Sequence, residues 1–404
     1  MITLPVSLSL EKIEAVIDEI YRVDQAELEL PVQTKHIAFG GYAAAIQAVN
    51  TWARKHSERS LLVKESKSGI EDSIENVIKY PHKFTAAMMA KNITLTDAES
   101  LDIRKNIYSY AKESIIRQSE HLYGQNHGRL CWYSFVDHST KGFDRNYYSL
   151  PKFGKVQTRG LNQITNVIKA MVEKSSLVAG GGILLSEDEV SSLGRLFYEL
   201  FLNTDEHGRQ GYGNKLLKPG SRVIYTYGIN LTDEGVTNSV KNDLALQKYI
   251  ENLSLLDISA NKFIELSVVD SGLGYCNRWL ATDTSDIDEK ELNITQEYDI
   301  LTKCFKFRET STNSMVKGNG LPSVMSNLRA LRAFIRIRSN RLCVYKDFAK
   351  RDDMELSQSN YNFYDWDSML PCEDKLTVKN NVSGVSVTIL IPLEMKNSRF
   401  GESK

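Results

Sequence analysis

The sequence predicts an α/β protein, and its second half predicts an α/β sandwich built on a mixed sheet. Apolar residues recur at helical spacing over 186–207 and again over 321–333. Between and after these segments, short apolar or alternating runs are typical of strands. The predicted order is a helix, two strands, a loop, a second helix and a run of strands. This order is expected when helices cover a sheet. The predicted strands are 222–230, 263–270, 334–339, 341–346, 375–379 and 384–391, with a helical insert at 239–255.

The first half of the chain predicts a separate domain, also mixed α/β. Helical periodicity alternates there with short apolar runs, and 146–150 is the expected hairpin partner of a strand at 130–137. The other predicted elements are helices at 9–22, 42–56, 70–79, 97–123 and 159–174 and a strand at 60–63. The predicted organisation is a first domain of 1–155, a helical linker of 156–185 with a glycine run at 179–182, a second domain of 186–395 and a tail of 396–404.

Composition and charge narrow the classes of function. The chain has 404 residues, of which 42% are hydrophobic and 25% charged, as in ordinary globular proteins. A formal net charge of −1 gives no global electrostatic reason to expect nucleic acid or an anionic membrane as a partner. The five cysteines are far apart and form no C-x-x-C pair, which favours a reducing compartment. Because the sequence has no signal-peptide pattern and no apolar run of bilayer length, we expect a cytoplasmic protein without a membrane span.

The first motif with chemical meaning lies on the first helix of the second domain. Ser186 and Glu189 form a capping box at its start, and Gly208 is the expected residue after its end. Glu199 and Asn203 are one helical turn apart, so their side chains lie on the same side of the helix. An amide oxygen is a suitable ligand for Mg²⁺, and a carboxylate nearby can orient or deprotonate a water. Taken alone, the pair is better explained as part of the polar face of an exposed helix, because Glu and Asn are common at this spacing.

A second motif follows the strand predicted at 263–270. Asp270 ends this strand and is followed by Gly272 and Gly274. The carboxylate can accept a hydrogen bond from an amine, and the glycines let a ligand approach the backbone closely. The ordinary alternative is a surface turn of the Asp-Ser-Gly type.

A third motif precedes the helix predicted at 321–333. Its glycines leave the first N–H groups of the helix free, and these groups and the helix dipole favour an anion such as a phosphate. The ordinary alternative is a helix-start loop with no ligand. The residues of this motif are Gly318, Asn319, Gly320 and Leu321.

In their order and context, these motifs resemble the GHKL ATPase superfamily of gyrase, the large heat-shock chaperone, sensor histidine kinases and the mismatch-repair ATPase. The shared pattern is a helical E-x-x-x-N, a strand ending in D-x-G-x-G, a G-x-G-L that enters a helix, and a last strand that ends in I-P-L. The resemblance covers about residues 186–395 and leaves the first 180 unexplained. It implies a Bergerat-type fold, in which helices cover a mixed sheet, with ATP and Mg²⁺ as ligands.

The resemblance also implies a role for each motif residue. Asn203 would hold Mg²⁺ against the phosphates, and Glu199 would be the general base. Asp270 would accept a hydrogen bond from the adenine amine, with Gly272 and Gly274 beside the base and ribose. Residues 275–317 would form a mobile lid over ATP, within which the polar run 308–312 is a further candidate contact. The residues implied to wrap the phosphates are Gly318, Asn319, Gly320 and Leu321.

The chain departs from the family pattern in two places. Pro322 follows Leu321 where many members continue with glycine, although proline is compatible with the first turn of a helix. Gly384 is followed by Val385 where many members have a threonine that helps a water bind adenine. The threonine contact is therefore lost or passes to a neighbour such as Ser386.

Three functions are compatible with this pattern. The leading prediction is Mg²⁺-dependent ATP hydrolysis that drives a conformational or dimerisation switch, because Glu199 is typical of hydrolysing members. The second is a protein kinase on the same fold, acting on Ser or His, although His121 lacks the flanking pattern of a phosphoacceptor. The third is a non-hydrolysing nucleotide sensor. A homodimer or a protein partner would use the first domain or the insert at 209–262.

Overall fold

The first 102 residues contribute a five-stranded sheet with the strand order β1-β2-β3-β4-β5. Strands β1 to β4 are parallel, and β5 is antiparallel to β4. Leu28, Leu61 and Ile93 lie side by side on neighbouring strands and point into the core, because side chains alternate between the two faces of a strand. The strands are β1 (Ile2–Thr3), β2 (Leu28–Leu30), β3 (Ser60–Lys64), β4 (Asn92–Thr96) and β5 (Leu101–Asp102). The computed structural model describes the chain except residues 36, 38, 97–100, 140, 150–154, 179–184, 283–291, 306–324, 326, 351–361 and 394–404.

The second sheet has eight strands in the order β14-β13-β12-β15-β11-β10-β7-β6. Every pair of neighbours in it is antiparallel, so the mixed sheet predicted for the second half is wrong. The helical insert between β10 and β11 returns the chain in the opposite direction, and a tight turn does the same between β12 and β13. The strands are β6 (Gln125–His127), β7 (Leu130–Val136), β10 (Ser221–Asn230), β11 (Lys262–Asp270), β12 (Phe334–Asn340), β13 (Leu342–Asp347), β14 (Tyr364–Asp365) and β15 (Val382–Pro392).

The large sheet crosses the predicted boundary between the two halves. Strands β6 and β7 come from the first 155 residues, yet β7 pairs with β10 along seven residues. All seven residues of β7 are buried, because helices cover both faces of the sheet at this place. The predicted division at 156–185 therefore does not coincide with an edge of the sheet.

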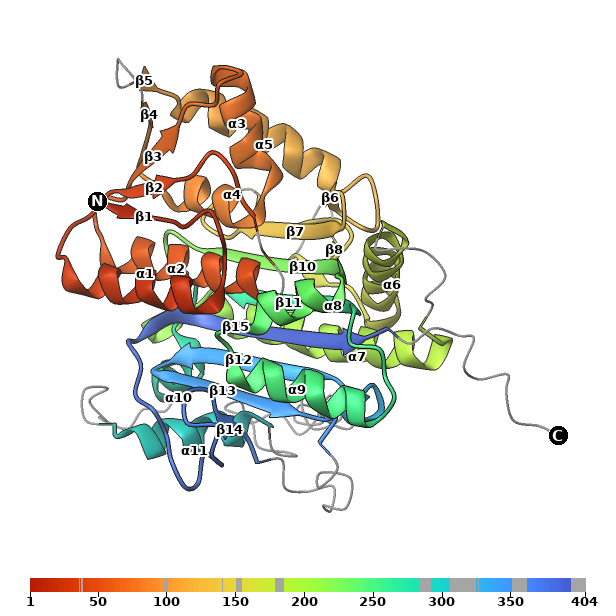
Figure 1. The fold of residues 1–404 in the computed structure, drawn as a ribbon. Helices are drawn as coiled ribbons and strands as arrows, with labels where there is room; N and C mark the ends of the chain where they lie inside the picture. Colours follow the sequence, from red (N-terminus) through yellow and green to blue (C-terminus); the bar gives the residue numbers. More distant parts are fainter. Residues whose placement is uncertain are drawn as a thin grey trace.

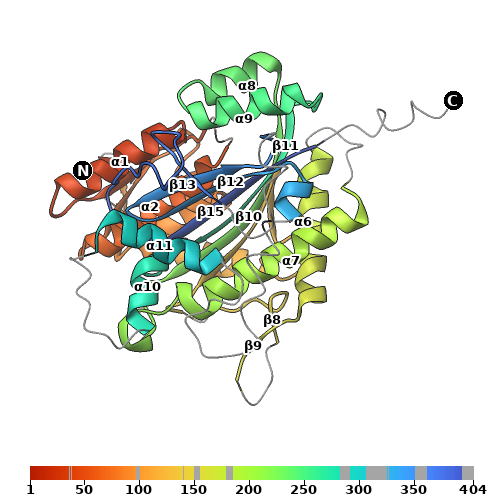
Figure 2. The ribbon, with the colours of Figure 1, turned by 90° about the horizontal axis from the view of Figure 1, so that it is seen from below.

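The elements stack in four layers. Helices α1, α2 and α4 lie between the five-stranded and the eight-stranded sheets, and their apolar side chains share one core with both sheets (Figure 1). Helices α6, α7, α10 and α11 cover the opposite face of the eight-stranded sheet and enclose a second core (Figure 2). The helices are α1 (Leu10–Arg22), α2 (Gly41–Lys55), α3 (Ile70–Lys79), α4 (Pro81–Met89), α5 (Arg104–Gln118), α6 (Leu161–Val178), α7 (Glu187–Asn203), α8 (Asp233–Val240), α9 (Leu244–Leu255), α10 (Gly274–Thr282) and α11 (Ile294–Phe305).

Helix α7 begins as its capping box predicts. The Ser186 hydroxyl accepts a hydrogen bond from the Glu189 N–H at 3.3 Å, and the Glu189 carboxylate accepts one from the Ser186 N–H at 2.6 Å. Its end differs from the prediction, because the α-helix stops at Asn203 and continues as a single π-helical turn, η1 (Thr204–Gly208).

Two predicted strand assignments are wrong. Within the segment 146–150, β8 (Tyr148–Ser149) pairs with β9 (Gln157–Thr158) and not with β7, both of whose edges are already occupied by β6 and β10. The segment 375–379 is not a strand, because the backbone N–H and hydroxyl of Thr377 donate to the carboxylate of Asp365 at 2.9 and 2.8 Å. The single helix predicted at 97–123 is also too long, because this range contains the strand β5 and the shorter helix α5. The glycine run at 179–182 lies outside the described residues.

Candidate functional site

The end of α7 and the turn after β11 meet at Gly208. A Cβ atom on Gly208 would lie 2.7 Å from the Asp270 Cγ, and one on Gly272 would lie 2.6 Å from the Gly208 carbonyl oxygen. These approaches are closer than a side chain permits, so glycine is required for space. Gly208 was expected to follow the helix as its C′ residue, a position that often has a positive φ, but Gly208 does not adopt one. The structure therefore brings together two of the predicted motifs, the one on α7 and the one at Asp270.

Asp270 presents one fixed and one available carboxylate oxygen. Its Oδ1 accepts hydrogen bonds from the Gly272 N–H at 2.8 Å and from the Val385 N–H at 3.3 Å. Its Oδ2 accepts none from any residue that the structure describes. The residue is only 3% exposed, and burial raises the pKa of its carboxyl to about 7 although the two backbone donors lower it. The carboxyl is thus poised to accept a hydrogen bond at Oδ2 near neutral pH.

Three glycines shape the backbone around Asp270. Gly384, in β15, has φ +72° and passes so close to the Asp270 carbonyl that a Cβ would lie 1.9 Å from its oxygen. Gly274 has φ +80°, and a Cβ there would lie 2.4 Å from the Asn340 Oδ1. The Asn340 side chain accepts from the Cys276 N–H at 3.1 Å and so caps α10. The packing of the chain itself therefore requires glycine at 384 and 274, as it does at 272.

Ser386 does not replace the family threonine beside Asp270. It pairs with Val269 on β11, and side chains of successive residues on a strand point to opposite faces. Ser386 therefore lies on the face covered by α2, whereas the Asp270 side chain lies on the face covered by α7. In this chain the backbone N–H of Val385 makes the contact with Asp270.

Glu199 and Asn203 lie on the half-buried side of α7. The core side of the helix carries Leu196, Phe197 and Leu200, which are all buried. Neither Glu199 nor Asn203 forms a hydrogen bond or ion pair with any side chain in the described part of the chain. Burial raises the pKa of Glu199, and Arg195 lowers it less. A raised pKa suits a carboxylate that takes a proton near neutral pH.

The π turn η1 carries polar residues toward α10. Arg278 of α10 is 8% exposed, and its Nη2 donates to the Gln210 Oε1 at 2.9 Å. Its Nε lies 3.4 Å from the His207 Nδ1. Single π turns inside helices are rare and are often found at functional sites. Arg278 was not predicted from the sequence, in which it is one charged residue within the expected lid.

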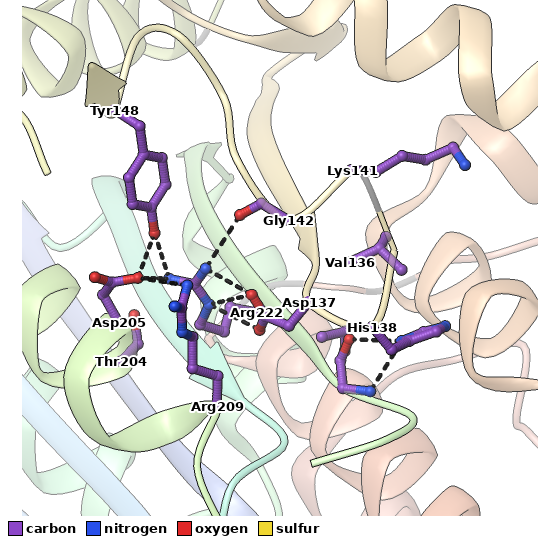
Figure 3. Close-up of polar contacts among 12 residues, drawn as sticks. Val136, Asp137, His138, Lys141, Gly142, Tyr148, Thr204, Asp205, Arg209 and Arg222 are labelled. Carbon is purple, nitrogen blue, oxygen red and sulfur yellow. Dashed lines mark hydrogen bonds and ion pairs between the residues drawn. The ribbon is translucent and has the colours of Figure 1, made fainter. Parts of the chain in front are cut away.

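A buried arginine fastens η1 to the first half of the chain (Figure 3). Arg222 Nε and Nη2 donate to the carboxylate of Asp137 at 2.9 and 2.7 Å, and Nη1 donates to the Tyr148 hydroxyl at 2.9 Å. Nη1 also lies 3.4 Å from the Asp205 Oδ1, which accepts from Tyr148 at 2.6 Å and from Arg209 at 3.1 Å. Burial lowers the pKa of Arg222, but Asp137, Tyr148 and Asp205 raise it by more, so Arg222 remains a cation.

Arg222 is also the neighbour of Asp270 across the sheet. The two residues pair in register between β10 and β11, and their side chains therefore point to the same face. Phe135 of β7 occupies the next place in the same row, with its ring centroid 4.9 Å from the guanidinium carbon. An arginine among the mainly apolar residues of this strand is the sequence signal that could have indicated this cluster.

Several predicted residues lie outside the part of the chain that the structure describes. They are Gly318, Asn319, Gly320 and Leu321, the polar run 308–312, and the lid segments 283–291 and 306–317. Within the range predicted to form a lid, the structure describes the helices α10 and α11. Among the described residues, no group of three or more His, Cys, Asp or Glu side chains could hold a metal ion.

The chain matches no protein-family model, no curated protein and no solved structure. Over its described residues, none of the helices is both long and apolar enough to cross a bilayer.

Proposed function

We propose that this protein binds ATP where α7, η1 and the turn after β11 meet, in the manner of the GHKL ATPases. The observation that carries the proposal is the carboxyl of Asp270. Two backbone N–H groups hold its Oδ1, while Oδ2 has no partner among the described residues and can accept the exocyclic amine of adenine. Helices α6, α7, α10 and α11 on one face of the eight-stranded sheet are the part of the fold that supports a Bergerat-type domain, although this sheet is antiparallel and α2 and α4 cover its other face.

Asn203 and Glu199 supply the polar groups for the phosphate end of the nucleotide. Both project from the half-buried side of α7, and neither is tied to another described side chain. The amide oxygen of Asn203 fits Mg²⁺, which prefers oxygen ligands and keeps several waters. When bound, Mg²⁺ would neutralise phosphate charge. Glu199 would orient an attacking water and take its proton, for which its raised pKa is suited.

A binding measurement tests the proposal. We expect wild type to bind ATP with Mg²⁺, and Asp270→Asn to bind it about 10- to 100-fold more weakly, as loss of a hydrogen bond to a charged group implies. The asparagine oxygen would accept from the two backbone N–H groups, so its NH₂ would face the adenine amine, donor against donor. Wild type that shows no ATP binding in calorimetry would refute the proposal.

The fate of the γ-phosphate distinguishes three outcomes. Phosphate release that is lost in Glu199→Gln, with ATP binding retained, identifies a hydrolase whose closure over ATP reshapes the chain or drives dimerisation. Transfer of labelled γ-phosphate to a Ser or His of this chain or of a partner identifies a kinase. ATP that is bound but remains intact identifies a nucleotide sensor. Size measurements with ATP and with ADP test the dimerisation step.

A further inference from the structure

Helix α2 runs along β11 on the face of the large sheet opposite to α7. At its start, the Gly40 N–H donates to the Glu265 Oε2 at 2.8 Å, and at its end Arg54 donates to the Ser271 carbonyl. From Gly40 to Arg54 an α-helix rises about 21 Å, at about 1.5 Å per residue. From Glu265 to Ser271 a strand spans about 20 Å, at about 3.4 Å per residue. The two lengths agree, so one rigid helix follows the strand as far as the candidate site.

The side of α2 that faces the sheet carries four polar residues, which we call the polar stripe of α2. Their spacing of three and four residues places them on one side of the helix. Three of the four are 2% exposed or less and each bonds the end of a strand. Burying so many polar groups is unfavourable unless each is hydrogen-bonded, so these contacts hold the helix in one position on the sheet. The stripe consists of Gln47, Asn50, Thr51 and Arg54.

Two residues of the stripe hold the backbone of the Asp270 turn. The Asn50 Nδ2 donates to the Asp270 carbonyl at 3.3 Å, and its Oδ1 accepts from the Ser221 hydroxyl at 3.1 Å. The Arg54 Nε and Nη2 both donate to the Ser271 carbonyl, at 3.1 and 3.0 Å. The peptide that carries Asp270 is thus held from the α2 side, while its carboxyl faces the α7 side.

Gln47 is the residue of the stripe that holds a strand away from this turn. The Gln47 Nε2 donates to the Arg338 carbonyl in β12 at 2.9 Å. Gln47 and Asn50 are 1% and 0% exposed, and each side chain donates one hydrogen bond to a strand carbonyl. Gln47 is therefore a matched control for Asn50, with similar burial on the same helix but no contact with the Asp270 turn.

We infer that Asn50 is a positioning residue for Asp270, and that α2 is the element through which the first half of the chain sets the affinity of the candidate site for ATP. The inference rests on the proposed function. A hydrogen bond weakens steeply as its geometry departs from the optimum, so a small shift of the Asp270 peptide reduces adenine recognition. Because such coupling is reciprocal, ATP binding strengthens the contacts of α2 in return.

Asn50→Ala and Gln47→Ala in the full chain test this inference. Gln47→Ala loses one buried hydrogen bond and Asn50→Ala loses two, so we expect both to lose thermal stability and Asn50→Ala to lose more. We expect Gln47→Ala to bind ATP as wild type does, and Asn50→Ala to bind it about tenfold more weakly. Arg54→Lys keeps the positive charge but cannot donate the same pair of hydrogen bonds to Ser271, and we expect it to weaken binding as well. Arg54→Lys serves as the second variant if Asn50→Ala does not fold.

Hydrogen exchange without nucleotide separates this inference from the proposed function. The N–H groups of Gly272 and Val385 both donate to Asp270 and report whether the turn is held. We expect both to exchange faster in Asn50→Ala, or in Arg54→Lys, than in Gln47→Ala. If these two N–H groups exchanged at the same rate in Asn50→Ala or Arg54→Lys as in the Gln47→Ala control, the inference would be overturned whether or not the protein binds ATP. Wild type that binds ATP, with variants that all bind it equally, would overturn the inference and leave the proposed function standing. Wild type that fails to bind ATP would instead overturn the proposed function and, with it, the role assigned to α2.

Discussion

Arg222 and Asp137 form a fully buried, two-pronged ion pair that joins the second half of the chain to the first. The Arg222 Nη2 lies 2.7 Å from the Asp137 Oδ1, and the two side chains are 1% and 2% exposed. The same guanidinium reaches Asp205 on η1, directly after the α7 helix that carries Asn203. The candidate site is therefore held from the α7 side by Arg222, as it is held from the α2 side by Asn50.

Replacing Arg222 by methionine is expected to destabilise the protein by about 3–5 kcal/mol, because it leaves the Asp137 carboxylate buried without its cation. Urea unfolding measures the loss. The control is Arg209→Gln, which removes a more exposed cation from Asp205 and should cost no more than about 1 kcal/mol. A loss for Arg222→Met no larger than that of the control would show that the buried pair contributes little.

ATP binding is expected to tighten as the pH rises from 6 to 8. The pKa of Asp270 is raised to about 7 by burial, and its proton would sit on Oδ2 because Oδ1 accepts two backbone hydrogen bonds. A protonated Oδ2 donates and cannot accept the adenine amine, so binding requires deprotonation. Calorimetry at several pH values in buffers of different ionisation enthalpy measures both the affinity and the released proton.

The matched control for this pH dependence lies on the same strand. Glu265 is also fully buried, and its pKa is also raised to about 7 by burial, but it faces α2 instead of the candidate site. Glu265→Gln should therefore keep the pH dependence of binding, whereas Asp270→Asn should abolish it. If the pH dependence of ATP binding disappeared in Glu265→Gln, the titrating group would be Glu265 and not Asp270, and the prediction would be wrong.

Gly208→Ala is expected to weaken ATP binding about tenfold and to lower the melting temperature. The new methyl group would lie 2.7 Å from the Asp270 Cγ, so either η1 or the carboxyl must move. The control is Gly160→Ala, whose new methyl group would meet only the flexible end of Gln163. Both variants can be compared by thermal unfolding and calorimetry, and equal binding by the two would contradict the close contact of η1 with Asp270.

His82 is expected to make the protein less stable below pH 6.5. It is completely buried against Tyr42 and Tyr80, and neither ring nitrogen has a hydrogen-bond partner among the described residues. Burial, and then Lys83, hold its pKa well below 6.5. The folded state therefore keeps His82 neutral while the unfolded state gains a proton, and stability falls as the pH drops from 6.5 toward the lower folded pKa.

His82→Phe tests this titration. The ring keeps its place in the aromatic cluster and no longer leaves buried polar atoms unpaired, so we expect about 1 kcal/mol more stability at pH 7 and a larger gain at pH 5.5. The control is His121→Phe, at an exposed position, which should change neither value by more than about 0.5 kcal/mol. A gain for His82→Phe that does not grow on acidification would exclude His82 as the titrating group.

The sequence by itself determined those features that depend on nearby residues. The capping box of Ser186 and Glu189, the helices α1, α2 and α3, and the strands β10, β11 and β15 all lie where the pattern predicts them, within one or two residues. Their signals are local, because apolar periodicity and helix capping act within a few residues of the chain. Asp270 and Asn203 were predicted as site residues from the order of the motifs along the chain and from the family that this order resembles.

Only the tertiary structure decided which distant segments meet. Strand β7 from the first half joins the large sheet. Asn50 holds the Asp270 turn although the two residues are 220 positions apart in the sequence, and Asp137 neutralises Arg222 although they are 85 positions apart. No local pattern encodes such pairs, because a buried polar side chain is satisfied by whichever partner the complete fold places beside it. The π turn and the antiparallel order of the sheet have the same origin, since both follow from how the layers pack and not from the propensity of any one segment.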